Sequence, residues 1–185
     1  MFYEEIQDVY QLCSYLLSYP SKEFFDSLTE IESEIDSLQK GKIKKELQQF
    51  ITKVKELSPD QLVDMYVYTF DFGKKTNLYV TYMSSGEQRE RGVDLLFLKN
   101  YYKEHGFQAT DLELPDYLPL MLEFAGQVEA ETLKPVFVKY YNNIVEIQDG
   151  LLAQNNLFGH IVAAALEALH ESGIKKQKRR SVVEC

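Results

Sequence analysis

The amino-acid sequence predicts an all-α fold, namely a single-domain bundle of roughly eight or nine helices. Three observations support this prediction: apolar residues recur at helical spacing along nearly the whole chain, capping residues precede these stretches, and proline or glycine follows them. A chain of 185 residues, of which 45% are hydrophobic, is long enough to bury one sizeable core. We therefore expect a helical domain over residues 1–172 and a basic, disordered tail over residues 173–185.

The first third of the chain is predicted to form three helices. Apolar residues share one helix face over residues 3–18, and Pro20 ends that helix. Ser21 is the expected N-cap of a second helix, and Gly41 separates the second helix from a third. The apolar residues that we expect the second helix to bury are Phe24, Phe25, Leu28, Ile31 and Ile35. Those of the third helix are Ile43, Leu47, Phe50, Ile51 and Val54.

Two capping sequences are expected to open the next two helices. Residues 58–61 combine a serine cap, a proline in the first turn and a glutamine that can complete a capping box, which predicts a helix as far as Phe70. Residues 74–85 then form a connection whose alternation is too short to predict a sheet. Residues 85–88 repeat the capping arrangement and open a helix that closes near His105. The apolar residues on this helix are Val93, Leu96, Phe97 and Tyr101.

The rest of the chain is predicted to hold a second connection and three more helices. The connection covers residues 111–115, and Asp116 is the expected N-cap of a short helix with Pro119 in its first turn. The residues of this helix that we expect to point inward are Leu120, Met121 and Phe124. Residues 131–152 and 157–171 each carry the helical pattern, and the last of these segments is rich in alanine.

The charge distribution points away from nucleic acids and towards cationic partners. The net charge is −9, and because five cations lie at the C-terminal end, the rest of the chain carries −14. The N-terminus opens with Glu4 and Glu5 rather than a basic leader, and no stretch approaches the roughly 20 apolar residues needed to cross a bilayer. We therefore expect a cytoplasmic protein. The two cysteines, Cys13 and Cys185, predict neither a disulfide framework nor a metal site.

The motifs of common enzymes are missing from the sequence. It contains no glycine-rich phosphate-binding turn, and its three histidines are scattered singly. Asp116 and Glu123 are seven residues apart, which would place both on nearly the same helix face, so a helical hydrolase using this pair is one alternative. We favour a capping aspartate and an outward or salt-bridged glutamate, with Arg89 or Arg91 as possible mates. The prediction is a protein that is not an enzyme and that needs no cofactor.

Two stretches carry a more specific signal. The first comprises residues 66–71 (YVYTFD), 78–82 (LYVTY) and 86–92 (GEQRERG), and the second is residues 113–124 (ELPDYLPLMLEF). In their order and spacing these stretches resemble the NarJ family, the respiratory nitrate reductase assembly chaperones, also called the delta chain. That family belongs to the redox-enzyme maturation chaperones. One departure is Tyr117, which follows the Pro-Asp pair where many relatives have histidine.

The resemblance implies an all-helical chaperone of this maturation type that acts on one enzyme system. Its expected partner is the apo form of the nitrate reductase catalytic (alpha) subunit, chiefly through the N-terminal segment of that subunit. The chaperone would keep its client open until the molybdenum cofactor is inserted, and it would withhold membrane attachment until then. An acidic body with an aromatic groove suits a basic amphipathic helix independently of the resemblance.

The resemblance also indicates which residues bind the client peptide. The expected set is Tyr66, Thr69, Phe70, Tyr79, Tyr82, Pro115, Asp116, Tyr117 and Glu123. Asp116 and Tyr117 lie at a helix start, where both side chains can face outward, so we expect them to serve client recognition more than folding. The alternative from another class is a helical adaptor or regulator that binds some other partner helix.

Overall fold

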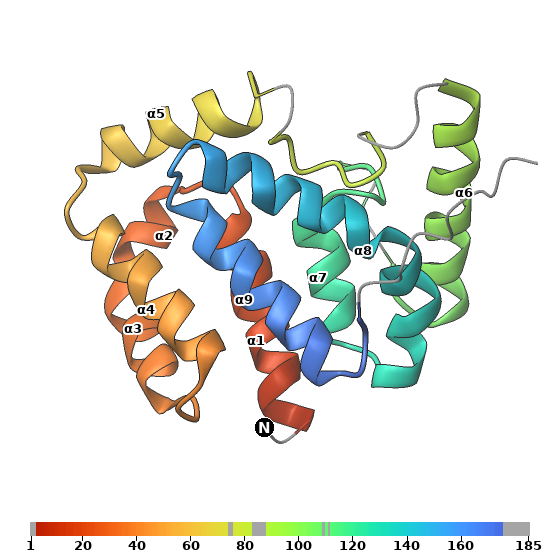
Figure 1. The fold of residues 1–185 in the computed structure, drawn as a ribbon, viewed down its shortest axis with the longest axis horizontal. Helices are drawn as coiled ribbons and strands as arrows, with labels where there is room; N and C mark the ends of the chain where they lie inside the picture. Colours follow the sequence, from red (N-terminus) through yellow and green to blue (C-terminus); the bar gives the residue numbers. More distant parts are fainter. Residues whose placement is uncertain (1–2, 74–75, 83–87, 109, 111, 176–185) are drawn as a thin grey trace, which may run out of the picture.

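Nine helices make up most of the part of the chain that the structure describes (Figure 1). The computed structural model describes residues 3–73, 76–82, 88–108, 110 and 112–175. The helices are α1 (Tyr3–Leu17), α2 (Lys22–Asp26), α3 (Leu28–Ser37), α4 (Lys42–Val54), α5 (Pro59–Phe70), α6 (Gln88–Glu104), α7 (Leu118–Ala125), α8 (Ala130–Ala153) and α9 (Phe158–Glu171). In these ranges the chain forms no strand beyond one isolated antiparallel bridge, between Tyr79 and Tyr117. The all-α prediction is confirmed.

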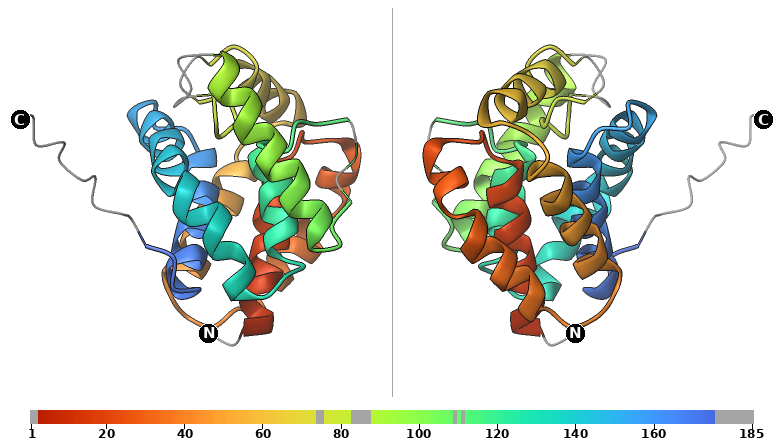
Figure 2. Two further views of the ribbon diagram at one scale, coloured as in Figure 1. Left: turned by 90° about the vertical axis from the view of Figure 1, so that its right-hand side faces the viewer. Right: turned by 90° about the vertical axis from the view of Figure 1, so that its left-hand side faces the viewer.

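The alanine-rich helix α9 lies in the middle of the bundle. It packs against α1, α4 and α8, and α7 packs on the other part of α1 (Figures 1 and 2). Its small side chains at Ala164, Ala165 and Ala168 are fully buried. Small residues let helix backbones approach closely, so α9 can serve as the shared packing surface of several neighbours. The core is therefore built around the last predicted helix of the chain.

The predicted second helix is interrupted in the structure. Residues 22–37 form two helices, α2 and α3, which meet at Ser27. The Ser27 hydroxyl donates to the Phe24 carbonyl oxygen at 3.0 Å, a local side-chain bond that competes with helix continuation. Ser21 does occupy the N-cap position, but its hydroxyl donates to the Glu23 carboxylate at 2.6 Å and does not cap the backbone. The prediction of one helix and of a serine side-chain cap is wrong here.

The helix starts at Ser58 and Asp116 have opposite outcomes. At Ser58 the capping box is confirmed, because the Gln61 backbone N–H donates to the Ser58 Oγ at 3.3 Å and the Ser58 N–H donates to the Gln61 Oε1 at 2.8 Å. At α7 the N-cap is Tyr117, and no side chain caps the helix. Asp116 as an N-cap is therefore wrong. The cap predicted over residues 85–88 lies mainly outside the described residues, and α6 begins at Gln88.

Helix α6 lies at one edge of the molecule, at the opposite end from α2, α3 and α4 (Figure 1). Its inner face runs through Leu98 and Tyr102, which are 0% and 1% exposed. Val93 and Leu96 on the same helix are 65% and 60% exposed. A helix at the edge of a bundle buries only a narrow stripe, so the residues beside that stripe stay in solvent.

The termini and cysteines complete the description of the fold. Cys13 is fully buried in the core, and this burial raises the pKa of its thiol to about 12. Cys185 and the tail from residue 176 onwards lie outside the described residues, so the division at residues 172 and 173 stays a prediction. Within the described ranges, no helix combines the length and the apolar composition that crossing a membrane requires.

Candidate functional site

Four tyrosines from distant parts of the chain form a continuous row, which we call the tyrosine row. The Tyr19 ring, just after α1, meets the Tyr66 ring of α5 edge to face, with 5.6 Å between ring centroids. The hydroxyls of Tyr66 and Tyr117 are 3.2 Å apart, and the Tyr117 ring lies 5.5 Å from the Tyr79 ring. The row thus joins α1, α5, the start of α7 and the connection that precedes α6.

Backbone hydrogen bonds hold this connection against the start of α7. The Val80 N–H donates to the Asp116 carbonyl oxygen at 2.9 Å, and the Leu118 N–H donates to the Leu78 carbonyl oxygen at 2.8 Å. Leu78 and Val80 point into the core, at 2% and 0% exposed. The alternation therefore turns Tyr79 in the opposite direction, towards the tyrosine row.

Asp116 lies beneath the row and ties the connection down. Its side chain is 0% exposed, and its Oδ2 atom accepts from the Thr81 N–H at 3.2 Å and from the Thr81 hydroxyl at 2.6 Å. The guanidinium of Arg91 donates to the same oxygen at 3.5 Å. The neighbouring carbonyl oxygen, of Pro115, accepts from the Tyr102 hydroxyl at 2.8 Å. The expectation that Asp116 faces outward is wrong, because the connection covers it.

The hydroxyls of Tyr66, Tyr79 and Tyr117 are neutral groups at physiological pH. Tyr79 donates to the Glu113 carboxylate at 2.8 Å, and burial together with this bond raises the pKa of Tyr79 to about 12. Burial also raises the pKa of Tyr66 and of Tyr117 above the ordinary value. Tyr66 donates to the Leu17 carbonyl oxygen at 3.1 Å, so it can accept from Tyr117. The row therefore offers hydrogen-bonding groups and aromatic faces rather than charge.

The other predicted site residues divide into core and surface positions. Thr69 is 1% exposed and its hydroxyl accepts from the Asn156 side-chain amide at 2.7 Å, while Phe70 is 6% exposed and packs on Tyr66. Both belong to the support under the row. Glu123 is exposed near the far end of α7 from Tyr117, and its carbonyl oxygen accepts from Gln11 of α1. It does not join the others.

The structure adds residues that the sequence analysis did not place in the site. Tyr19 precedes a proline and looks like a turn residue in the sequence, and Glu113 and Thr81 lie inside the quoted motifs without any pattern that marks their roles. Arg91 was named only as a possible mate of Glu123, whereas in the structure it pairs with Asp116. Tyr82, which was predicted, is 55% exposed and lies against the Arg91 guanidinium.

A groove whose walls are mainly apolar, but which also carry Lys99 and Lys103, adjoins the tyrosine row. It has a volume of about 600 Å³ and lies between α6 and the connection that leads to α7. Leu96 and Leu114 in its walls are 60% and 41% exposed. Glu113 and Pro115 line the groove as well, and Glu113 connects it to the tyrosine row by accepting a hydrogen bond from Tyr79. Exposed apolar side chains gathered in a groove are typical of a protein or peptide interface. The row and the groove together are the candidate functional site.

The hydrolase alternative is not supported by the geometry. Asp116 precedes α7 and is buried, whereas Glu123 is exposed, so the two carboxylates do not share a helix face. The described residues contain no group of three or more His, Cys, Asp or Glu side chains that could hold a metal ion. His160 bonds to the Glu46 carboxylate at 2.7 Å, and His105 is exposed just after α6.

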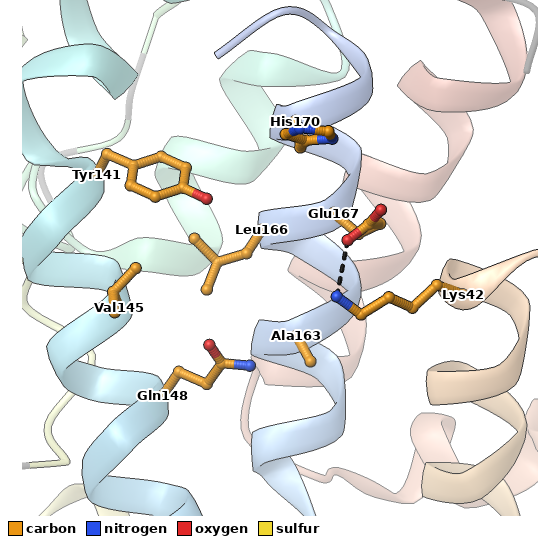
Figure 3. A pocket seen from close by; sticks show the side chains of 8 residues that line it. All are labelled: Lys42, Tyr141, Val145, Gln148, Ala163, Leu166, Glu167 and His170. Atoms are coloured by element: carbon orange, nitrogen blue, oxygen red, sulfur yellow. Dashed lines mark hydrogen bonds and ion pairs between the residues drawn. The ribbon is translucent and has the colours of Figure 1, made fainter. Parts of the chain in front are cut away.

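A second hollow, of about 220 Å³, lies between α8 and α9 beside the start of α4 (Figure 3). Lys42 and Glu167 form an ion pair of 2.8 Å there, His170 follows Glu167 along α9, and Tyr141 faces the hollow from α8. Because the lysine and the carboxylate neutralise each other, this hollow offers a ligand little net charge. It is a smaller and more polar hollow than the groove beside the tyrosine row.

Comparison with known proteins identifies the family. The family described as nitrate reductase delta subunit matches residues 36–164. A protein of Bacillus subtilis (strain 168) named as a probable nitrate reductase molybdenum cofactor assembly chaperone, NarJ, is 43% identical over 95% of this chain and 96% of its own length. The nitrate reductase molybdenum cofactor assembly chaperone NarJ of Escherichia coli (strain K12) is 35% identical over 43% of this chain and 34% of its own.

A third relative places the same kind of sequence inside a much longer protein. The nitrate reductase-like protein NarX of Mycobacterium tuberculosis (strain ATCC 25618 / H37Rv) is 30% identical over 84% of this chain. The matched part makes up 23% of the length of NarX. The family match covers most of the chain, including both stretches on which the resemblance rests. The chain therefore belongs to the nitrate reductase delta subunit family.

Proposed function

We propose that this protein is a cytoplasmic, system-specific chaperone that matures a respiratory nitrate reductase. It binds the apo catalytic subunit of that enzyme, chiefly at its N-terminal segment, and enables molybdenum cofactor insertion before the enzyme attaches to the membrane. The observation that carries this proposal is the 43% identity, over 95% of the chain, to a protein named as such an assembly chaperone. The cofactor belongs to the client, and the chaperone itself needs none.

The tyrosine row and the adjoining groove are the proposed client-binding site. Tyr19 and Tyr82 are each 55% exposed, and the groove is large enough, at about 600 Å³, to receive several apolar side chains of a helix. The charge of −14 outside the basic tail attracts a basic segment over long range. Apolar anchors would then supply affinity, and charge would supply the rate of association.

The predicted client-binding residues take two roles in this proposal. Tyr79, Tyr82, Pro115 and Tyr117 lie at or near the surface and are proposed to contact the client. Glu123 lies apart from them, near the other end of α7, and is proposed as a separate acidic contact. The remaining members lie beneath the surface and are proposed to support those contacts. These supporting residues are Tyr66, Thr69, Phe70 and Asp116.

Replacing Tyr82 with alanine is expected to weaken client binding about tenfold, because truncation of an aromatic anchor at an interface typically costs more than 1 kcal/mol. The melting temperature should change little, since Tyr82 is 55% exposed. The measurement is calorimetry with a synthetic peptide of the N-terminal segment of the catalytic subunit. Tyr68→Ala is the matched control, because Tyr68 is 74% exposed on α5. Equal affinity in both variants would remove Tyr82 from the site.

A cellular experiment separates the chaperone from the adaptor alternative. Affinity capture of this protein from cells that respire nitrate is expected to recover the catalytic subunit lacking its cofactor. Deletion of the protein should leave that subunit present but inactive. Capture of a different partner, together with normal nitrate reductase activity in the deletion strain, would favour the adaptor.

A further inference from the structure

Arg91 occupies an enclosed position between the connection and α6. Its guanidinium carbon lies 6.0 Å from the centre of the Tyr79 ring and 5.7 Å from the centre of the Tyr82 ring. Its Nε atom donates to the Thr81 hydroxyl at 3.3 Å, and its Nη2 atom donates to the buried Asp116 carboxylate at 3.5 Å. Two aromatic faces, a hydroxyl and a carboxylate therefore surround one cation.

These surroundings have the chemistry of a cation-binding site. The faces of aromatic rings attract cations, and cages of such rings bind ammonium groups in other proteins. The contact between Arg91 and Asp116 is 3.5 Å long, whereas a strong charge-assisted hydrogen bond measures about 2.7–2.9 Å. The second oxygen of Asp116, Oδ1, is buried and has no hydrogen-bond partner among the described residues. Part of the acceptor capacity of the Asp116 carboxylate is therefore unused.

We propose that Tyr79, Tyr82 and Asp116 form a cation-binding subsite, which Arg91 fills in the free protein and which a guanidinium or ammonium group of the bound client takes over. The identity of the client rests on the proposed function, whereas the subsite itself does not. Arg91 is in the first turn of α6, and its side chain is 25% exposed, so it has a route to solvent.

Exchange of one cation for another keeps the buried carboxylate neutralised throughout. Removing one member of a buried ion pair is costly because the other charge stays uncompensated, and exchange avoids that cost. Tyr82 is 55% exposed, so an incoming side chain can reach the outer face of the subsite from solvent. The acidic body, at −14, raises the local concentration of a basic segment. Arg91 thereby acts as an internal stand-in for a basic residue of the client.

Chemical rescue tests the subsite without any client. The full-length Arg91→Ala variant should melt at a lower temperature than the original protein, and millimolar ethylguanidinium should restore much of the loss. Sodium chloride at equal concentration should not restore the melting temperature of Arg91→Ala. Ethylguanidinium should not raise the melting temperature of the double variant Arg91→Ala/Tyr82→Ala. Equal responses of the original protein and of Arg91→Ala to ethylguanidinium would overturn the subsite.

Peptide binding tests the takeover. With the N-terminal client peptide, Arg91→Ala is expected to bind at least threefold more tightly than the original protein, because nothing has to be displaced. Substituting glutamine for the basic residues of the peptide should abolish that difference. If the peptide binds the original protein but Arg91→Ala gives no gain, the takeover is wrong. If no peptide binds the original protein, the proposed client site fails while the rescue result stands by itself.

A second variant covers the case in which Arg91→Ala does not fold. Tyr82→Ala removes one aromatic face at an exposed position, so the fold is expected to survive. It should reduce the preference for the basic peptide over its glutamine version, whereas Tyr68→Ala on α5 should keep that preference. An unchanged preference in Tyr82→Ala would contradict the subsite.

Discussion

Replacing Asp116 with alanine is expected to destabilise the fold by about 3 kcal/mol, because it removes one member of a buried, hydrogen-bonded charge pair. The carboxylate is 0% exposed, and Thr81 and Arg91 both donate to its Oδ2 atom. This result differs from the loss of a helix cap, for which about 1 kcal/mol is typical. Urea unfolding, followed by circular dichroism, measures the free energy of unfolding directly.

Two variants serve as controls for Asp116→Ala. Asp116→Asn keeps a side-chain oxygen that can accept from Thr81 and should lose less stability. Glu123→Ala removes an exposed carboxylate from α7 and should leave the free energy of unfolding nearly unchanged. If Asp116→Ala were as stable as Glu123→Ala yet bound the client poorly, Asp116 would be a contact residue rather than a supporting one.

Replacing Phe158 with alanine is expected to cost about 4 kcal/mol, within the range for deleting a buried phenylalanine side chain. Phe158 is 1% exposed at the start of α9, and its ring lies 5.7 Å from Phe50 of α4. It also lies 5.6 Å from Tyr66 and 5.0 Å from Phe70, both on α5. Since this ring supports Tyr66, the variant should weaken client binding as well as lower the melting temperature.

The exposed Phe72 gives a matched control for this core substitution. It is 74% exposed just after α5, so Phe72→Ala should change the free energy of unfolding by less than about 0.5 kcal/mol. Phe158→Leu should fall between the two, because leucine refills part of the cavity. Equal stability of Phe158→Ala and Phe72→Ala would contradict the packing of α5 on α9.

Most helices could be predicted from sequence because their apolar residues repeat at helical spacing over three turns or more. The α4 stripe, from Ile43 to Val54, is buried as predicted. The differences lie where the outcome depends on more than the apolar repeat. The break between α2 and α3 coincides with the hydrogen bond from the Ser27 hydroxyl to the Phe24 carbonyl oxygen. Val93 and Leu96 stay exposed because α6 lies at the edge of the bundle.

The sequence predicted which segments form the site, but not which of their residues are buried. The motifs indicated that residues 66–71, 78–82 and 113–124 belong together, and the structure joins them through Tyr66, Tyr79 and Tyr117. An aspartate before a helix has the same local sequence whether it caps the helix or is buried under another segment. Asp116 is buried only because the connection, distant in sequence, folds over it.

The helices differ in how much of their surface is buried, and therefore in how easily each can unfold locally. Ten of the 14 residues of α9 are buried, whereas the buried side chains described on α6 are those of Leu98 and Tyr102. Amide hydrogens of α9 should therefore exchange with deuterium only when the whole protein unfolds. Those of α6 should exchange through local unfolding, which requires less free energy. One wall of the groove can thus rearrange around an incoming segment while the α1–α9 centre stays closed.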